Sequence, residues 1–136
     1  MARYPILKIE GIGDSYAATL TSAGIRSTAT LLDRAKDPKG RKTLASETGI
    51  EETRILKWAN MADLMRIRGV GEEYSELLEA AGVDTVKELK MRRPDNLHAK
   101  MIEVNAARKL VRQPPSASAV TRWIEEAKSL PAMMTY

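Results

Sequence analysis

Apolar residues recur at helical spacing along this chain, and one such pattern occurs twice. Residues 9–25 read Ile-x-Gly-Ile-Gly-x-x-Tyr-x-x-x-Leu-x-x-Ala-Gly-Ile, and residues 67–83 repeat this pattern 58 positions later with Val at two of the Ile positions. Of the 23 aligned pairs that begin at Ile9 and Ile67, eight are identical. Self-similarity at a fixed spacing indicates one structural unit used twice.

Each copy of the pattern predicts a short helix followed by three more. The Tyr, Leu and Ala positions lie four and three residues apart, as on one helix face, and the glycine after them is expected to end the helix in a left-handed conformation. Ser27 and Thr85 stand where the next helix needs its N-cap, and Thr85 with Glu88 makes a capping box. This second helix is expected to end near Asp37-Pro38 in the first copy and near Arg93-Pro94 in the second, so a proline marks the same boundary in both. The expected later helices are 28–35, 41–48 and 55–65 in the first copy, and 86–91, 96–110 and 120–130 in the second.

The last predicted helix of each copy carries one tryptophan. Trp58 and Trp123 occupy the same place in matching apolar patterns, but their displacement is 65 positions. About seven residues are therefore inserted in the second copy, and we place them around residues 112–116, where two prolines favour an extended connector. The spacing of both tryptophans is that of a core-facing stripe, so we expect them to pack and not to contact a ligand.

The sequence predicts an all-α protein with two tandem units. A chain of 136 residues with 43% apolar content can bury a compact core, and the absence of Phe leaves Leu, Ile, Val, Met and Ala to build it, a set that favours packed helices. We expect a first unit at residues 1–63, a second at 64–130 and a loosely held C-terminal tail at 131–136.

Composition also limits the chemistry. The chain has no Cys and a single histidine, His98, so neither a thiolate site nor a histidine metal cluster is expected. No apolar run approaches the length of a membrane span, and the first residues lack the apolar middle of a signal peptide. We expect a cytoplasmic protein with no membrane contact, no cofactor or metal, and no small-molecule substrate.

Two glycines that flank one apolar residue indicate a tight hairpin between two short helices. This motif occurs as Gly11-Ile12-Gly13, the first hairpin, and as Gly69-Val70-Gly71, the second hairpin. The apolar residue is expected to plug the helix pair, while the amides that follow point outward at a helix N-terminus. Such an arrangement suits a phosphate oxygen, because the helix dipole and several unpaired N–H groups converge on one anion.

Residues 67–89 resemble the helix-hairpin-helix motif in the N-terminal domain of archaeal RadA recombinases and, more loosely, the C-terminal domain of the bacterial RNA polymerase alpha subunit. Residues 48–56, Thr-Gly-Ile-Glu-Glu-Thr-Arg-Ile-Leu, resemble the second hairpin of the recombinase domain. The whole chain also looks like an uncharacterised bacterial family of tandem domains of this kind. The resemblance implies two five-helix units of the helix-hairpin-helix (SAM-like) type, and it brings no established activity.

In DNA-binding members of this class, hairpin amides hold the phosphates of duplex DNA without reading sequence, and nearby cations add charge. A net charge of +4 is compatible with such a partner. The resemblance implies these contact residues: Lys8, Gly11, Ile12, Gly13, Ser15, Arg66, Arg68, Gly69, Val70 and Gly71.

Carboxylates next to the hairpins count against phosphate binding. Asp14 follows the first hairpin, and Glu72 with Glu73 follows the second, where each occupies the positive end of a helix dipole. The first hairpin, with one carboxylate and Ser15, is therefore the better phosphate site. In the alternative interpretation both hairpins only turn the chain, and the protein is an interaction adaptor or a homo-oligomer. The acidic residues that favour this alternative are Asp14, Glu72, Glu73, Glu76 and Glu79.

An enzyme is not expected. The glycines match neither a Walker loop nor a dinucleotide fingerprint, because no Gly-Lys-Ser/Thr and no third glycine follow at the required spacing. The adjacent pairs at 51–52 and 125–126 diverge on a helix and cannot work as an acid/base pair. Scarce aromatic residues also argue against binding of single strands by base stacking.

Overall fold

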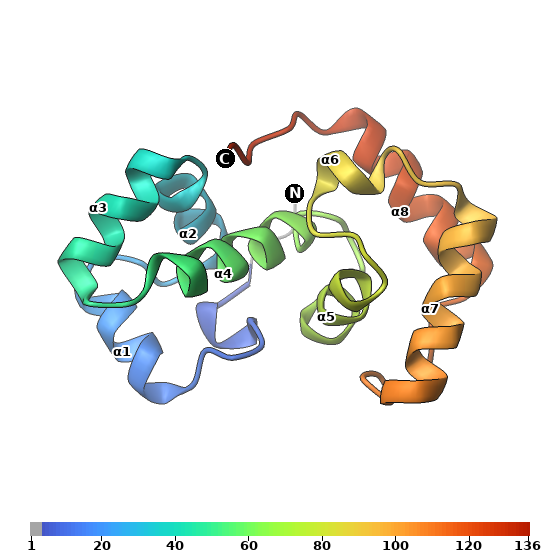
Figure 1. The fold of residues 1–136 in the computed structure, drawn as a ribbon, viewed down its shortest axis with the longest axis horizontal. Coiled ribbons are helices and arrows are strands. Elements are labelled where there is room, and N and C mark those ends of the chain that lie inside the picture. The colour runs from blue at the N-terminus through green and yellow to red at the C-terminus, as the bar shows by residue number, and fades with distance from the viewer. Residues whose placement is uncertain (1–3) are drawn as a thin grey trace.

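The computed structural model describes residues 4–136, and the predicted all-α class is confirmed there (Figure 1). Residues 4–136 form a short 3-10 helix and eight α-helices, and an isolated bridge pairs Pro5 with Ser27. The elements are η1 (Ile6–Lys8), α1 (Asp14–Ser22), α2 (Thr28–Ala35), α3 (Pro38–Thr48), α4 (Glu52–Leu64), α5 (Glu72–Ala80), α6 (Val86–Leu89), α7 (Pro94–Arg108) and α8 (Ala117–Ser129).

The four α-helices of the first half recur in the second half. α1 and α5 begin 58 positions apart and α4 and α8 begin 65 apart, as the two displacements in the sequence predict. The added length lies partly in α7 and partly in the connection after it. Residues 49–51 join α3 to α4, whereas residues 109–116 join α7 to α8.

Side-chain caps set the starts of four of the eight α-helices in residues 4–136. The Ser27 hydroxyl accepts a hydrogen bond from the Thr30 amide, and Thr85 accepts one from the Glu88 amide. A proline lies at the boundary between the second and third helices of both halves, as predicted: α2 ends before Pro38 and α6 ends before Pro94. The third helices begin earlier than expected, because Pro38 and Pro94 are the first residues of α3 and α7. Proline suits this position because the first helical N–H has no intrahelical partner to lose.

Each half has its own apolar cluster, centred on its tryptophan. Trp58 is 2% exposed and its ring centroid lies 5.0 Å from that of Tyr16, while Trp123 is 4% exposed and lies 5.2 Å from Tyr74. The predicted core role of both tryptophans is confirmed. Leu64, at the end of α4, already belongs to the second cluster, so this helix connects the two halves.

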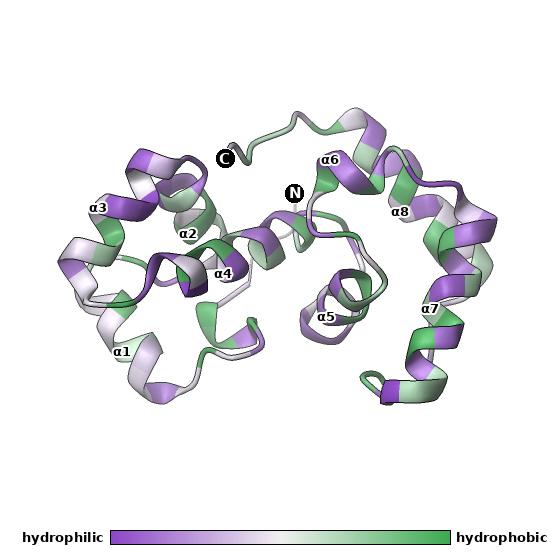
Figure 2. Cartoon of the chain, in the orientation of Figure 1, coloured by the Kyte–Doolittle hydropathy of each residue, from purple (hydrophilic) through white to green (hydrophobic). Residues whose placement is uncertain are grey.

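Each α-helix carries both hydrophobic and hydrophilic residues (Figure 2). Among the described residues no helix combines the length and the apolar character needed to cross a bilayer.

The expectation of a loosely held tail at residues 131–136 is wrong. This C-terminal strap leaves α8 and returns to the first half, where Met134 is buried in the apolar cluster. The Thr135 amide donates to the Lys36 carbonyl over 2.8 Å, and the buried Arg41 guanidinium donates to the Thr135 carbonyl over 2.7 Å. The Tyr136 ring lies 5.7 Å from the same guanidinium. The strap therefore ties the end of the second half to the first.

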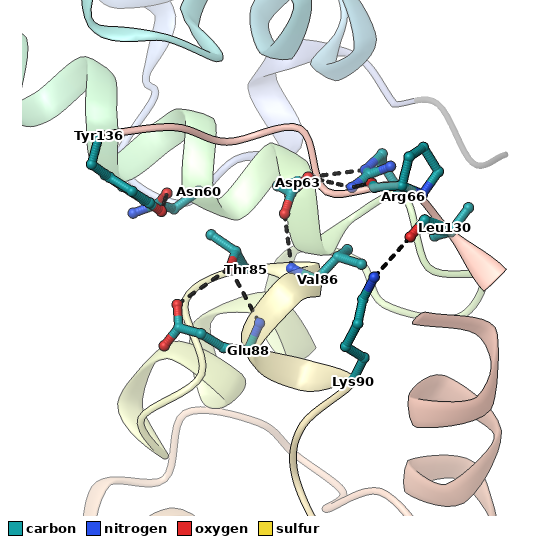
Figure 3. Close-up of polar contacts among 10 residues, drawn as sticks. Asn60, Asp63, Arg66, Thr85, Val86, Glu88, Lys90, Leu130 and Tyr136 are labelled. Atoms are coloured by element: carbon teal, nitrogen blue, oxygen red, sulfur yellow. Dashed lines mark hydrogen bonds and ion pairs between the residues drawn. The ribbon is translucent and has the colours of Figure 1, made fainter. Parts of the chain in front are cut away.

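A buried ion pair joins the two halves at the end of α4 (Figure 3). A guanidinium nitrogen of Arg66 lies 2.7 Å from a carboxylate oxygen of Asp63, and the two side chains are 3% and 1% exposed. The Asp63 carboxylate also accepts a hydrogen bond of 2.8 Å from the amide of Val86, the first residue of α6. The Arg66 guanidinium donates a hydrogen bond of 2.9 Å to the Pro131 carbonyl of the strap. The pKa of Asp63 is raised above its ordinary value, because burial raises it by more than the Val86 hydrogen bond and the Arg66 charge together lower it.

Candidate nucleic-acid interface

The two hairpins have the same backbone geometry. Gly11 and Gly69 both have a left-handed φ, +94° and +87°, which disfavours any residue with a side chain. Each turn is closed by one hydrogen bond of 3.1 Å, from the Ile12 amide to the Ile9 carbonyl and from the Val70 amide to the Ile67 carbonyl. The predicted turns are thus present in both halves.

Each hairpin sits on the tryptophan of its own half. A Cβ atom added to Gly11 would lie 3.4 Å from Nε1 of Trp58, and one added to Gly69 would lie 3.3 Å from Nε1 of Trp123. The glycine therefore serves both the turn and the close approach to the indole. The same contact between a turn glycine and a tryptophan therefore occurs in both halves.

Ile12 and Val70 are buried, as the hairpin pattern predicts. With their main chain included, the two residues are 4% and 0% exposed, so neither offers appreciable surface to a ligand.

The first hairpin presents a helix start that no side chain caps. Gly13 is the N-cap of α1, and no side chain forms a capping hydrogen bond there. A Cβ atom built on Gly13 would meet no other atom within 4 Å. Gly13, Asp14 and Ser15 are all exposed. The amides of the first helical turn have no partner within the helix, so they are available to an anion, although the Asp14 carboxylate stands beside them.

Arg54, which the hairpin motif did not indicate, lies beside this helix start. Its guanidinium carbon is 5.2 Å from the centre of the Tyr16 ring in the first turn of α1. Arg54 is exposed and forms no ion pair with the described residues. A signal was present in the sequence, because Arg54 is four residues before Trp58 and so shares the helix face that packs against Tyr16.

Carboxylates surround the second hairpin. The Arg68 amide, just before Gly69, donates to the Glu126 carboxylate of α8 over 3.2 Å. Glu72 and Glu73 occupy the first turn of α5, whose N-cap Gly71 has no side-chain cap. An approaching phosphate would therefore meet negative charge on both sides of the turn.

Glu10, from the turn of the first hairpin, adds to this negative charge. Burial is the main cause that raises the pKa of Glu72, and the neighbouring Glu10 carboxylate raises it further, against the opposing charge of Lys8. Burial followed by Glu10 likewise raises the pKa of Glu76. The first hairpin turn and the start of α5 therefore lie close together, which sequence reasoning did not anticipate because the two segments are about sixty positions apart.

The three predicted cations differ in their availability. Lys8 and Arg68 are exposed. The prediction that Arg66 contacts a phosphate is wrong, because its guanidinium is buried and donates hydrogen bonds to Asp63 and to the Pro131 carbonyl. The site that remains consists of the first hairpin, Lys8 and the added Arg54.

The described residues contain no group of three His, Asp or Glu side chains that could hold a metal ion. His98 is engaged structurally, since its Nε2 lies 3.0 Å from the Pro115 carbonyl oxygen.

Comparison with known proteins places the chain in a family. A family model described as a domain of unknown function, DUF4332, matches residues 10–130. No curated protein and no solved structure matches the chain. The expectation of an uncharacterised family is thereby confirmed, and the resemblance to the recombinase domain stays a prediction. Because the match covers most of the 136 residues, the protein belongs to the DUF4332 family.

Proposed function

We propose that this protein is a non-enzymatic module of two tandem helix-hairpin-helix units, and that it binds the backbone of duplex nucleic acid through its first hairpin without reading sequence. The observation that carries the proposal is the pairing of an exposed, uncapped helix start at Gly13 with an exposed cation, Arg54, held over Tyr16 in the same turn. Amides supply short-range donors to a phosphate oxygen, and the guanidinium supplies charge and a planar set of donors.

Charge distribution supports the first half as the binding half. Residues 1–66 contain eleven Lys or Arg and eight Asp or Glu, a net +3, whereas residues 67–136 contain eleven and ten, a net +1. With about two or three phosphate contacts, the logarithm of the binding constant should fall with the logarithm of salt with a slope of about −2 to −3. Such binding is weak and strongly dependent on salt.

The test is fluorescence anisotropy with a labelled duplex of random sequence over a salt series. Arg54→Gln should reduce the salt slope by about one and weaken binding at low salt. Arg122→Gln, which removes the same charge from an exposed position on the counterpart helix α8, is the matched control and should leave the slope unchanged. Absence of binding by the wild-type protein at low salt would overturn the proposal.

A protein-interaction adaptor or homo-oligomer is the second candidate, and the acidic start of α5 favours it. Glu72 and Glu76 have raised pKa values because they are partly desolvated beside other carboxylates, so a basic partner that covers them would relieve repulsion. The variant Glu72→Lys/Glu73→Lys separates the candidates. Stronger binding to the duplex supports nucleic acid as the ligand. Loss of self-association in light scattering, without gain in duplex binding, supports the adaptor.

A further inference from the structure

A second group of exposed cations lies in the part of the chain where the two halves differ most. Arg108, Lys109 and Arg112 fall within five residues at the end of α7 and in the connection that follows, here called the basic loop (residues 108–112). All three are exposed, and none forms an ion pair with the described residues. The shorter connection of the first half, residues 49–51, carries no cation.

The basic loop has a defined conformation. The buried Asn105 side chain accepts from the Val111 amide over 2.9 Å and donates to the Val111 carbonyl over 3.2 Å, which clamps the loop against α7. The Tyr74 hydroxyl donates to the Gln113 carbonyl over 3.0 Å. Because the backbone is already ordered, a ligand would have to immobilise only the long side chains, and this lowers the entropic cost of binding.

The same contacts place the basic loop beside the second hairpin. Tyr74 is in the first turn of α5, directly after that hairpin, and the Arg108 charge lowers the pKa of Glu76 on the same helix against the larger effect of burial. Figure 1 shows the C-terminal end of α7 and the N-terminal end of α1 at the same lower edge of the molecule, with α5 between them. A partner that follows this edge would meet the first hairpin at one end and the basic loop at the other.

The dipole of α7 accounts for part of the loop's composition, since cations are favoured at a helix C-terminus. That effect fades within the last turn and so does not extend to Arg112. Glu76 partly offsets the charge of Arg108. Lys109, the C-cap of α7, is still within reach of the dipole, so Arg112 is left as the cation of the basic loop that neither the dipole nor Glu76 explains. Lys109 moreover has φ +52°, the single left-handed non-glycine conformation among residues 4–136.

We propose that the basic loop is a second contact site for the phosphate backbone of duplex nucleic acid, and that Lys109 and Arg112 replace the hairpin amides that are used in the first half. This inference rests on the proposed function. An extended polyanion fits because its charges repeat along its length and can reach two sites on one edge, and two weak contacts on one ligand raise the overall affinity.

The experiment measures duplex binding over a salt series for the double variant Lys109→Asn/Arg112→Gln. Asn tolerates the left-handed conformation at position 109, so the loop should keep its shape. The control is Lys39→Asn/Lys42→Gln, which removes two charges from exposed positions on α3. Circular dichroism checks that both variants keep their helices.

The basic-loop variant should lower the salt slope by about one to two and weaken binding roughly tenfold at low salt, while the α3 variant keeps the wild-type slope. Equal slopes and affinities for the two variants would overturn the basic-loop site and leave the first hairpin as the whole interface, provided that Arg54→Gln still weakens binding. No binding by the wild-type protein would overturn both proposals together.

Discussion

The two hairpins share a sequence pattern, a backbone geometry and a packed tryptophan, yet the charged groups that differ between them have opposite signs, Arg54 at the first and Glu126 at the second. Beside the first, Arg54 lies over Tyr16. Beside the second, the position on α8 that matches Arg54 is Ala119, and the Tyr74 hydroxyl is instead hydrogen-bonded to the Gln113 carbonyl in the loop after α7. A duplicated motif thus preserves the turn, while the helices and loops around it decide whether the turn can meet an anion.

The start of the second helix differs between the halves in the same way. The Thr28 amide at the start of α2 donates to the Tyr4 carbonyl, whereas the matching Val86 amide at the start of α6 donates to the Asp63 carboxylate. In the second half a charged side chain has replaced a main-chain acceptor. Arg66 supplies the opposite charge to this buried carboxylate.

The largest expected effect comes from this junction. Asp63→Ala leaves the Arg66 guanidinium buried without its partner and should lower the free energy of unfolding by about 3–5 kcal/mol. Urea denaturation followed by circular dichroism measures the loss. The double variant Asp63→Ala/Arg66→Met removes the stranded charge and should recover a large part of the stability. A single variant that unfolds like the wild-type protein would show that the ion pair is dispensable.

The next effect comes from the strap. Met134→Ala removes a buried side chain from the apolar cluster of the first half and should destabilise the protein by about 2 kcal/mol. Native-state hydrogen exchange should show faster exchange in α2 and α3 and little change in α7. Met91→Ala, at an exposed position of the second half, is the control. Uniform acceleration in all helices would instead mean that the two halves unfold as one unit.

The turn glycines should behave alike in both halves. Gly11→Ala and Gly69→Ala each force a side chain into a left-handed backbone at the indole edge and should cost about 1–2 kcal/mol. Gly13→Ala and Gly71→Ala add a Cβ atom to open space at an extended backbone, so thermal denaturation should show a much smaller loss. Unequal losses for Gly11→Ala and Gly69→Ala would mean that the two hairpins do not have the same geometry.

The smallest effect is electrostatic. Glu72 has a pKa above its ordinary 4.5, so the folded state binds its proton more tightly than the unfolded state. This contribution to stability is complete below about pH 4.5 and is lost as the pH rises through the raised pKa. Glu72→Gln should therefore make the decline in stability between about pH 4 and 7 smaller, by a few tenths of a kcal/mol because the group is mostly solvated. Thermal denaturation at several pH values measures this, with Asp14→Asn at the matching position as the control.

Local patterns in the sequence were sufficient to predict most of the fold. The spacing of apolar residues, the left-handed glycines and the Ser27 and Thr85 caps depend on neighbours within a few positions, and all appear in the structure. The two tryptophans were also predictable as core residues, because a helix with one apolar stripe must turn that stripe inward.

The errors involve contacts between distant segments. The sequence predicts that Arg66 faces a phosphate, but Arg66 is buried between α6 and the strap. Its partner Asp63 binds the Val86 amide, 23 positions away, and Arg66 itself binds the Pro131 carbonyl, 65 positions away. The strap itself was expected to be loose, because nothing in its own six residues reveals the buried Arg41 that receives it.

The sequence by itself determined the repeated unit, its helices and its glycine turns, since these follow from backbone conformation and short-range periodicity. Only the tertiary structure decided which charges are free. It set Arg54 over Tyr16, Glu126 against the second hairpin and Glu10 near Glu72, because the position of a charge depends on how helices far apart in the chain pack together.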